Sequence, residues 1–327
     1  MPAAAVHSIL LKKENAHDDP IYCCAWTKTN TTGDSKAQLT DFIVTGGLDS
    51  LVKVWKLENN KLELLHSLQG HSMAVVSIAV SPDGYTLATT SLDCSMIIWD
   101  MLAGQLVHKI EADMTYVWKV TLSPDGTQIV ASSHTGKLDV FSVEFGKLDR
   151  VLDTRGKFAT CVAWSADGKY IASGSVDGIV CIFDVAQGKI LHTIEAHTKM
   201  IRSITFSPKC KSVISASDDG NVKIFDVASA GHQYTLQHKC AALAVCASPD
   251  GARVASAAAD GSVRVAVTDG LHVLHTFTEH TDSVCGVQFN AEGTKLLSVS
   301  KDKSINIYEC PVVTTPKNPP KSGTLIK

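Results

Sequence analysis

The sequence lacks an excess of positive charge. Its 30 lysine and arginine residues are outnumbered by 33 aspartate and glutamate residues, which gives a formal net charge of −3 and a pI near 6.5. Proteins that bind nucleic acid or anionic membranes directly usually carry a basic surface. We therefore expect no direct binding of nucleic acid, and any connection with RNA to be indirect.

Long apolar runs are missing as well. No stretch reaches the roughly 18 apolar residues that a membrane-spanning helix needs, and no charged start precedes a signal-like apolar core. We expect no membrane partner, and a location in the cytoplasm and the nucleus.

The ten cysteines show no disulfide or metal-site pattern. They are scattered from Cys23 to Cys310, and no two are spaced as Cys-x-x-Cys. Cys23 and Cys24 are neighbours, but neighbours on a strand point to opposite faces. We expect reduced, mostly buried thiols and no metal site.

Enzyme signatures are also missing. The sequence has no Gly-x-x-x-x-Gly-Lys-Ser/Thr phosphate loop, no His-Glu-x-x-His zinc motif and no nucleophile elbow. The prediction is a protein without catalytic residues or cofactors.

What the sequence does contain is an internal repeat. The segments 173–185 and 215–227 share Ser, Asp, Gly, Phe, Asp and Val at matched positions 42 residues apart. The position of the shared aromatic recurs seven times, with steps of 41 to 44 residues, at Trp55, Trp99, Phe141, Phe183, Phe225, Ala266 and Tyr308. A period in the forties indicates a repeat array.

Each repeat has the pattern of four short strands. In the fifth repeat the expected strands are Ile201–Phe206, Ser212–Ser217, Asn221–Asp226 and Gln233–Leu236, separated by turn residues. Ser-Pro-Asp-Gly turns recur, although Ser207-Pro-Lys-Cys210 has lost the glycine. The first repeat is longer, with a polar surface loop expected between Lys28 and Thr40.

Seven four-stranded units avoid long exposed sheet edges by packing radially. The sequence therefore predicts an all-β fold, a single seven-bladed β-propeller over residues 1–310. We expect the N-terminal strand Val6–Leu11 to supply the outer strand of blade seven and so close the ring. Residues 311–327 are rich in proline and lysine and are expected to form a flexible tail.

A polar set recurs around the predicted ring. A histidine precedes the turn aspartate by 22 residues, and a serine or threonine precedes it by four. The set comprises His71, Thr89, Asp93 and Trp99; Ser173 and Asp177; His197, Ser215 and Asp219; His238, Ser256 and Asp260; and His280, Ser298 and Asp302, with His17, Thr45 and Asp49 in the longer first repeat. The third repeat has lost all three residues, and the fourth has Arg155 in place of the histidine.

Ser, His and Asp together resemble hydrolase chemistry, but a catalytic triad occurs once in an enzyme, whereas this set recurs. We predict a structural hydrogen-bond network in each blade.

One face of the ring should carry the loops that hold this network. The residues expected to line the pore mouth on that face are Tyr22, Leu48, Val76, Leu92, Tyr116, Trp118, Phe158, Met200, Arg202 and Leu243. Aromatic and apolar residues with an arginine are typical of a protein-binding hot spot, so we predict a partner-binding site there.

The chain resembles WD-repeat propellers over residues 1–310. Four segments, 14–19, 47–55, 153–158 and 201–208, are more specifically similar to the WD-repeat subunits of superkiller (Ski) complexes, which are shared with the PAF transcription-elongation complex. The segment Asp153-Thr-Arg-Gly-Lys-Phe158 carries most of this likeness, because it replaces the usual Gly-His entry to a blade.

This resemblance implies a non-catalytic scaffold that holds a helicase and a tetratricopeptide-repeat subunit and supports exosome-mediated 3′–5′ mRNA decay. It also implies a nuclear role with PAF-complex subunits in transcription elongation and histone modification. Relatives grip a Gln-Arg and aromatic motif, which here would involve Tyr22, Trp118, Arg202 and Leu243.

The sequence departs from those relatives at two places. Tyr22 and Cys285 stand where tryptophan is usual, and Val265-Ala-Val replaces the aromatic-Asp pair of the sixth repeat, which predicts a looser blade six. An alternative is an adaptor of another assembly, either a ubiquitin-ligase substrate receptor or a signalling scaffold. A substrate receptor would normally show Trp-Asp-x-Arg, whereas this chain has Trp99-Asp-Met-Leu102.

Overall fold

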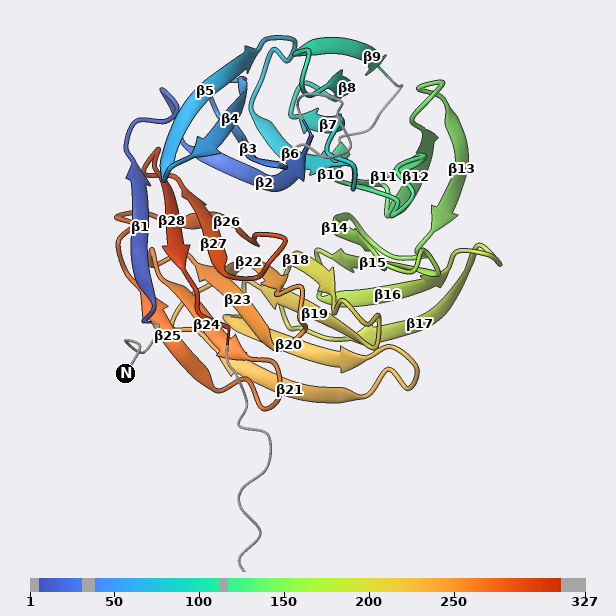
Figure 1. Cartoon of the computed structure of the whole chain (residues 1–327). Helices are drawn as coiled ribbons and strands as arrows, with labels where there is room; N and C mark the ends of the chain where they lie inside the picture. Colours follow the sequence, from blue (N-terminus) through green and yellow to red (C-terminus); the bar gives the residue numbers. More distant parts are fainter. Residues whose placement is uncertain (1–5, 31–38, 112–116, 313–327) are drawn as a thin grey trace, which may run out of the picture.

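The computed structural model describes residues 6–30, 39–111 and 117–312. Within them, 28 strands form seven antiparallel four-stranded sheets arranged around a central channel (Figure 1). The predicted all-β, seven-bladed propeller is confirmed. Most of the predicted loop at Lys28–Thr40 and of the predicted tail lies outside the described residues.

The first strand of each blade borders the channel, and the fourth lies on the rim. Blade one contains β2 (Ile21–Thr29), β3 (Thr40–Gly47), β4 (Val52–Glu58) and β5 (Lys61–Leu68); blade two, β6 (Val75–Val80), β7 (Thr86–Ser91), β8 (Ser95–Asp100) and β9 (Gln105–Glu111); blade three, β10 (Val117–Leu122), β11 (Gln128–Ser133), β12 (Lys137–Ser142) and β13 (Leu148–Asp153). Blade four contains β14 (Ala159–Trp164), β15 (Tyr170–Ser175), β16 (Ile179–Asp184) and β17 (Lys189–Glu195); blade five, β18 (Ile201–Phe206), β19 (Ser212–Ser217), β20 (Asn221–Asp226) and β21 (His232–Gln237). Blade six contains β22 (Ala242–Ala247), β23 (Arg253–Ala258), β24 (Val263–Val267) and β25 (Val273–Phe277); blade seven, β26 (Val284–Phe289), β27 (Lys295–Ser300), β28 (Ile305–Glu309) and β1 (Ser8–Lys13).

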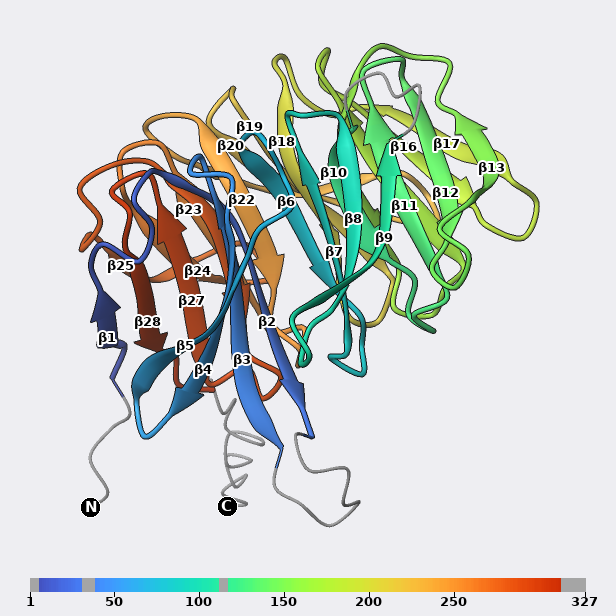
Figure 2. The same cartoon turned by 90° about the horizontal axis from the view of Figure 1, so that it is seen from above.

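The N-terminal strand closes the ring as predicted. β1 pairs antiparallel with β28, with Ser8 opposite Glu309 and Lys13 opposite Ile305, so the first and last strands lie side by side (Figures 1 and 2). Leu10 and Leu11 pack on the apolar cluster between blades seven and one. The outer strand of blade seven is thus supplied from the opposite end of the chain.

The core lies between the blades. Seven apolar clusters each combine residues of two successive blades, from Phe42 with Leu87 between blades one and two to Ile43 with Leu297 between blades one and seven. The recurring aromatic position contributes one residue to each cluster, but at the interface of blades five and six this residue is Ala266. Each blade is therefore stabilised mainly by its two neighbours.

Tight turns follow the repeat chemistry. Gly178 has φ of 84°, and a Cβ atom there would lie 2.0 Å from the carbonyl oxygen of His197, so no other residue fits without backbone movement. In the turn that has lost its glycine, Cys210 adopts the left-handed φ of 56°. The loss of the glycine therefore changes the residue but not the turn.

A second set of contacts joins neighbouring blades at the rim. On the outer strand of blades one to five, one side chain bonds to the turn between the third and fourth strands of the next blade; we call this set the outer belt. Its bonds are His66 Nε2 to Leu102 O (2.8 Å), His108 Nε2 to Glu144 O (2.8 Å), Arg150 Nη1 to Val185 O (3.1 Å), His192 Nε2 to Ala228 O (3.1 Å) and Tyr234 Oη to Asp269 Oδ1 (2.6 Å). At blade six, His275 instead stacks on His7, beside β1, with ring centroids 5.2 Å apart.

Candidate protein-binding site

The predicted polar network forms in full in four blades. In blade two, His71 Nε2 lies 2.9 Å from Thr89 Oγ1, which also accepts a 2.9 Å bond from Trp99 Nε1, while His71 Nδ1 lies 3.3 Å from Asp93 Oδ2. Blade one repeats this arrangement. Blades five and seven form the His197–Asp219 and His280–Asp302 bonds of 3.0 and 2.9 Å, with Ser215 and Ser298 on the other ring nitrogen.

The remaining blades depart from the prediction. In blade six His238 Nε2 contacts Ser256 Oγ at 2.8 Å, but Asp260 binds Ser262 instead, and His238 Nδ1 has no hydrogen-bond partner among the described residues. The predicted His238–Asp260 bond is therefore wrong. In blade four, Asp177 accepts from Ser175, so Ser173 and Asp177 are not joined through a histidine.

The network cannot present a nucleophile to a substrate. The hydroxyl-bearing residues that contact the histidines are all buried: Thr45, Thr89, Ser215, Ser256 and Ser298 are each 0% exposed, Ser95 is 3% exposed and Ser304 is 2% exposed. Burial lowers the pKa of His197 and of His71, against the opposing effect of their aspartates, so both rings are held neutral. In blades one, two, five and seven, the network joins the loop before the blade to the turn between its second and third strands.

The first strand of each blade begins beside these loops, and an irregularity near its start builds the site. In every blade the first strand shifts register against the second across one residue near its start. The bulged residues are Tyr22, Val76, Trp118, Thr160, Arg202, Leu243 and Cys285. A bulge leaves one residue unpaired and re-aims its side chain, so one local feature brings side chains from all blades to one end of the channel.

Six of the bulged residues line a single cavity of about 350 Å³, here called the mouth pocket. Its lining comprises Tyr22, Leu48, Val76, Leu92, Trp118, Lys119, Arg202, Leu243, Cys285 and Lys301. The seventh bulged residue, Thr160, is buried and donates a hydrogen bond to the carbonyl oxygen of Gly174. The pocket thus combines aromatic and aliphatic walls with three basic side chains.

Seven of the ten residues expected at the pore mouth are brought together in this pocket. Phe158 lies behind the lining and packs edge-on against Trp118, with ring centroids 5.7 Å apart. Met200 is not part of the lining, and Tyr116 lies outside the described residues.

Three further residues line the pocket. Lys301 directly precedes Asp302, the same position that Leu48 and Leu92 occupy before their turn aspartates, so the repeat pattern already contained this signal. Lys119 follows the bulged Trp118 and faces the pocket only because of the bulge. Cys285 is the bulged residue of blade seven.

The basic residues of the mouth pocket differ in their partners. Arg202 forms a two-pronged ion pair with Asp218, with nitrogen–oxygen distances of 2.8 and 2.7 Å. No side-chain hydrogen bond or ion pair involves Lys119 or Lys301 in the part of the chain that the structure describes. Burial raises the pKa of Cys285 to about 11, while Lys301, Lys119 and Arg202, which line the same pocket, act to lower it.

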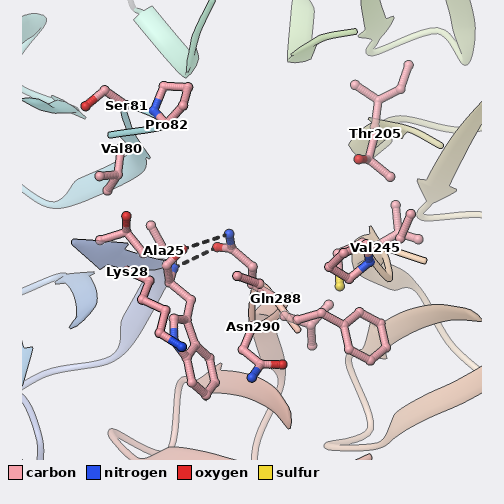
Figure 3. A pocket seen from close by; sticks show the side chains of 18 residues that line it. Ala25, Lys28, Val80, Ser81, Pro82, Thr205, Val245, Gln288 and Asn290 are labelled. Atoms are coloured by element: carbon pink, nitrogen blue, oxygen red, sulfur yellow. Dashed lines mark hydrogen bonds between the residues drawn. The ribbon is translucent and has the colours of Figure 1, made fainter. Parts of the chain in front are cut away.

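A second cavity, of about 560 Å³, lies at the opposite end of the channel, where the inner strands finish. Figure 3 shows side chains from several blades around it, among them Lys28, Thr205, Val245 and Gln288. The amide of Gln288 bonds to both backbone groups of Trp26, at 3.0 and 3.4 Å. The Gln288 side chain therefore links blades seven and one. Its amide group and the backbone groups of Trp26 are already hydrogen-bonded to each other and not to a ligand.

The described residues contain no group of three or more His, Cys, Asp or Glu side chains that could hold a metal ion. All ten cysteines are unpaired, and burial raises the pKa of the Cys23 and Cys161 thiols to about 12. Across residues 6–30, 39–111 and 117–312, no helix is long and apolar enough to cross a membrane.

Comparison with known proteins places this architecture in a family. A family model described as the IFT122 first beta-propeller matches residues 40–309, and a model of the WD domain, G-beta repeat, matches residues 8–56.

Individual relatives are similar over shorter segments. The chain is 31% identical over 94 residues to WD repeat-containing protein SL1-17 of Schistosoma mansoni, covering 29% of each chain. It is 34% identical over 88 residues to WD repeat-containing protein VIP3 of Arabidopsis thaliana, covering 27% of this chain and 25% of the relative. A third relative is small ribosomal subunit protein RACK1y of Oryza sativa subsp. japonica, 42% identical over 64 residues, or 20% of this chain and 18% of the relative. The chain thus spans less than a third of the length of each of these relatives. The family match covers most of the chain, and the chain therefore belongs to the IFT122 first beta-propeller family and is a WD-repeat β-propeller.

Proposed function

We propose that this chain is a non-catalytic scaffold that captures partner proteins at the mouth pocket. The observation that carries the proposal is the convergence of six bulged side chains, including Tyr22, Trp118 and Arg202, on one cavity. Aromatic residues and arginine dominate the binding energy of protein interfaces. The buried network, by contrast, leaves no accessible serine for a reaction.

We propose further that the assembly is a Ski-like complex, in which the propeller holds a helicase and a tetratricopeptide-repeat subunit and supports exosome-mediated mRNA decay in the cytoplasm. A nuclear pool would join PAF-complex subunits in transcription elongation and histone modification. The support is the likeness of segments such as Asp153–Phe158 to the WD-repeat subunits of Ski complexes.

A second candidate is an adaptor of a different assembly, either a ubiquitin-ligase substrate receptor or a signalling scaffold. One relative, 34% identical over 91 residues, is the WD repeat, SAM and U-box domain-containing protein 1 of Gallus gallus. The sequence Trp99-Asp-Met-Leu102 lacks the arginine expected in substrate receptors, which favours the Ski-like assembly.

The test is affinity purification of the tagged full chain from its own cells, in parallel with Trp118→Ala, followed by mass spectrometry of the bound proteins. A helicase recovered with a tetratricopeptide-repeat protein, and lost in Trp118→Ala, is the expected result. Recovery of elongation factors alone would favour the nuclear role, and recovery of ubiquitin-ligase components would favour the second candidate. Partners that bind Trp118→Ala as well as wild type would contradict capture at the mouth pocket.

A further inference from the structure

The charge of the mouth pocket constrains the chemistry of the segment it binds. Lys119, Arg202 and Lys301 come from blades three, five and seven, so three separate repeats contribute a cation to the same cavity. The whole chain, in contrast, carries a net charge of −3. The positive charge of this pocket is therefore local.

Within residues 6–30, 39–111 and 117–312, one of the three cations is neutralised by a carboxylate. Asp218 is bound to Arg202 through both of its carboxylate oxygens. Among the described residues, Lys119 and Lys301 have no such carboxylate. As far as the described ranges extend, the ammonium groups of Lys119 and Lys301 in the mouth pocket are therefore not compensated by a carboxylate.

Both lysines line the mouth pocket and influence other groups in its wall. Lys119 and Lys301 both act to lower the pKa of Cys285 in the pocket wall. Lys119 also acts to lower the pKa of Cys23 in blade one and of Cys161 in blade four. Asp282 acts to raise the pKa of Cys285. The carboxylate of Asp282 accepts a hydrogen bond from the backbone amide of Ser283. Lys119 thus contributes its charge to a pocket whose walls are largely apolar, and such walls weaken the screening of charge by water.

We propose that the mouth pocket binds a short acidic segment of a partner protein, in which an aspartate or glutamate is adjacent to an aromatic residue or leucine. The carboxylate pairs with Lys119 and Lys301, and the apolar side chain packs against Tyr22, Trp118 and Leu243. A volume of about 350 Å³ is at the lower end of the roughly 300 to 1,000 Å³ of ligand pockets, which suits a short segment. Charge complementarity of this kind selects the partner and excludes segments of the opposite sign.

The inference rests on the proposed function and differs from the Gln-Arg motif that the family resemblance implies. An arginine of the partner placed in this pocket would meet Lys119 and Lys301. Among the residues that the structure describes, the carboxylate in contact with a lining cation is that of Asp218, which is already held by Arg202. The sign of the bound charge therefore separates the two possibilities.

The test is selection of binders from a random peptide display library on the immobilised full-length protein. Four forms are compared: wild type, Trp118→Ala, Lys119→Glu with Lys301→Glu, and a control, Lys169→Glu with Lys211→Glu, which makes the same charge change at exposed sites near the opposite face. Synthetic versions of the enriched peptides, blocked at both ends so that no terminal carboxylate contributes, are then titrated.

We expect peptides that require Trp118 to carry Asp or Glu beside Phe, Tyr, Trp or Leu. The double lysine variant should weaken their binding by about tenfold or more and select basic peptides instead, while the control variant behaves like wild type. If the double variant does not fold, the single Lys119→Gln and Lys301→Gln variants should each reduce affinity for the same peptides.

Peptides that require Trp118 but are basic or uncharged would overturn this inference and leave capture at the mouth pocket intact. Peptides that bind equally well without Trp118 would overturn the proposed function, and this inference with it. Binding that needs a free peptide terminus would also overturn the inference, because the carboxylate would then not come from a side chain.

Discussion

Asp219 is a single residue on which two loops of blade five depend. Its carboxylate accepts bonds from His197 Nδ1 (3.0 Å), the amide of Thr198 (3.2 Å) and the amide of Asn221 (2.9 Å). Burial is the largest single influence and acts to raise the pKa of Asp219, but the hydrogen bonds from Asn221, His197 and Thr198 act in the opposite direction and the pKa is lowered. Asp219 is therefore ionised at neutral pH, and its carboxylate accepts all three hydrogen bonds.

We predict that Asp219→Ala lowers the free energy of unfolding by about 2 to 3 kcal/mol, because a buried histidine and two amides lose a charged acceptor. Asp177→Ala is the matched control, since Asp177 holds the same turn position in a blade without the histidine. It should cost less than half as much, as measured by urea unfolding. Equal losses in the two variants would show that the histidine contact contributes little.

The unpartnered ring nitrogen of His238 predicts a dependence of stability on pH. Burial, reinforced by Arg264, lowers the pKa of His238 to about 4, while Asp260 acts to raise it. An unfolded histidine has a pKa near 6.5. The unfolded state therefore binds the extra proton first, and stability falls as pH decreases from about 6.5 to about 4, by up to about 3 kcal/mol.

His238→Gln should flatten this decline when urea unfolding is measured between pH 7 and pH 4.5. His71 and His197 contribute in the same direction because their pKa values are also lowered, so a residual slope is expected. His272→Gln, a change at an exposed ring, should retain the wild-type slope. If the stability of His238→Gln depends on pH as steeply as that of the wild type, His238 is not the cause of the decline.

At the scale of elements, ring closure depends on β1. It supplies the outer strand of blade seven through its pairing with β28 and places Leu10 and Leu11 against the adjoining core. We predict that deletion of residues 1–13 lowers the melting temperature, because blade seven loses its outer strand and two of the ring's apolar contacts. Deletion of residues 1–5 alone keeps β1 and serves as the control. An unchanged melting curve for the longer deletion would refute this closure.

Blade six is the element expected to open most readily. Ala266 replaces the aromatic side chain that the other interfaces contain, and His238 lacks the bond to its turn aspartate. We predict that backbone amides of β24 exchange with solvent faster than those of β20, because local opening needs less free energy where fewer contacts are lost. Hydrogen exchange followed by mass spectrometry measures both strands in one sample, and equal protection would argue against a looser blade six.

For the whole molecule, the layout separates binding from stability. Trp118 lines the mouth pocket and is only partly buried, whereas Asp219 is in a buried network on which blade five depends. We predict that Trp118→Ala abolishes partner capture and keeps the melting temperature within a few degrees, since surface truncation leaves no core cavity. Asp219→Ala should show the opposite pattern, with lower stability and retained binding at low temperature. A large fall in melting temperature for Trp118→Ala would place that side chain in the core.

The sequence by itself determined the repeat number, the strands, the turns and most of the polar network. These features are encoded within a single repeat. A strand is specified by the alternation of apolar and polar residues along it, and a turn is specified by its glycine or aspartate. The network is specified by the fixed spacing between histidine and aspartate. Even so, His238 and Asp260 kept that spacing without forming their bond, which the spacing alone did not reveal.

Only the tertiary structure decided which side chains meet across the ring. The bulges turn Trp118, Lys119 and Arg202 toward a common pocket, and the outer belt joins His66 and His108 to the turns of the following blades. Both depend on strand register and on the distance between blades, which no single repeat contains. The fold could thus be derived repeat by repeat, but the charge of the binding site arose only when residues of blades three, five and seven were brought to the same cavity.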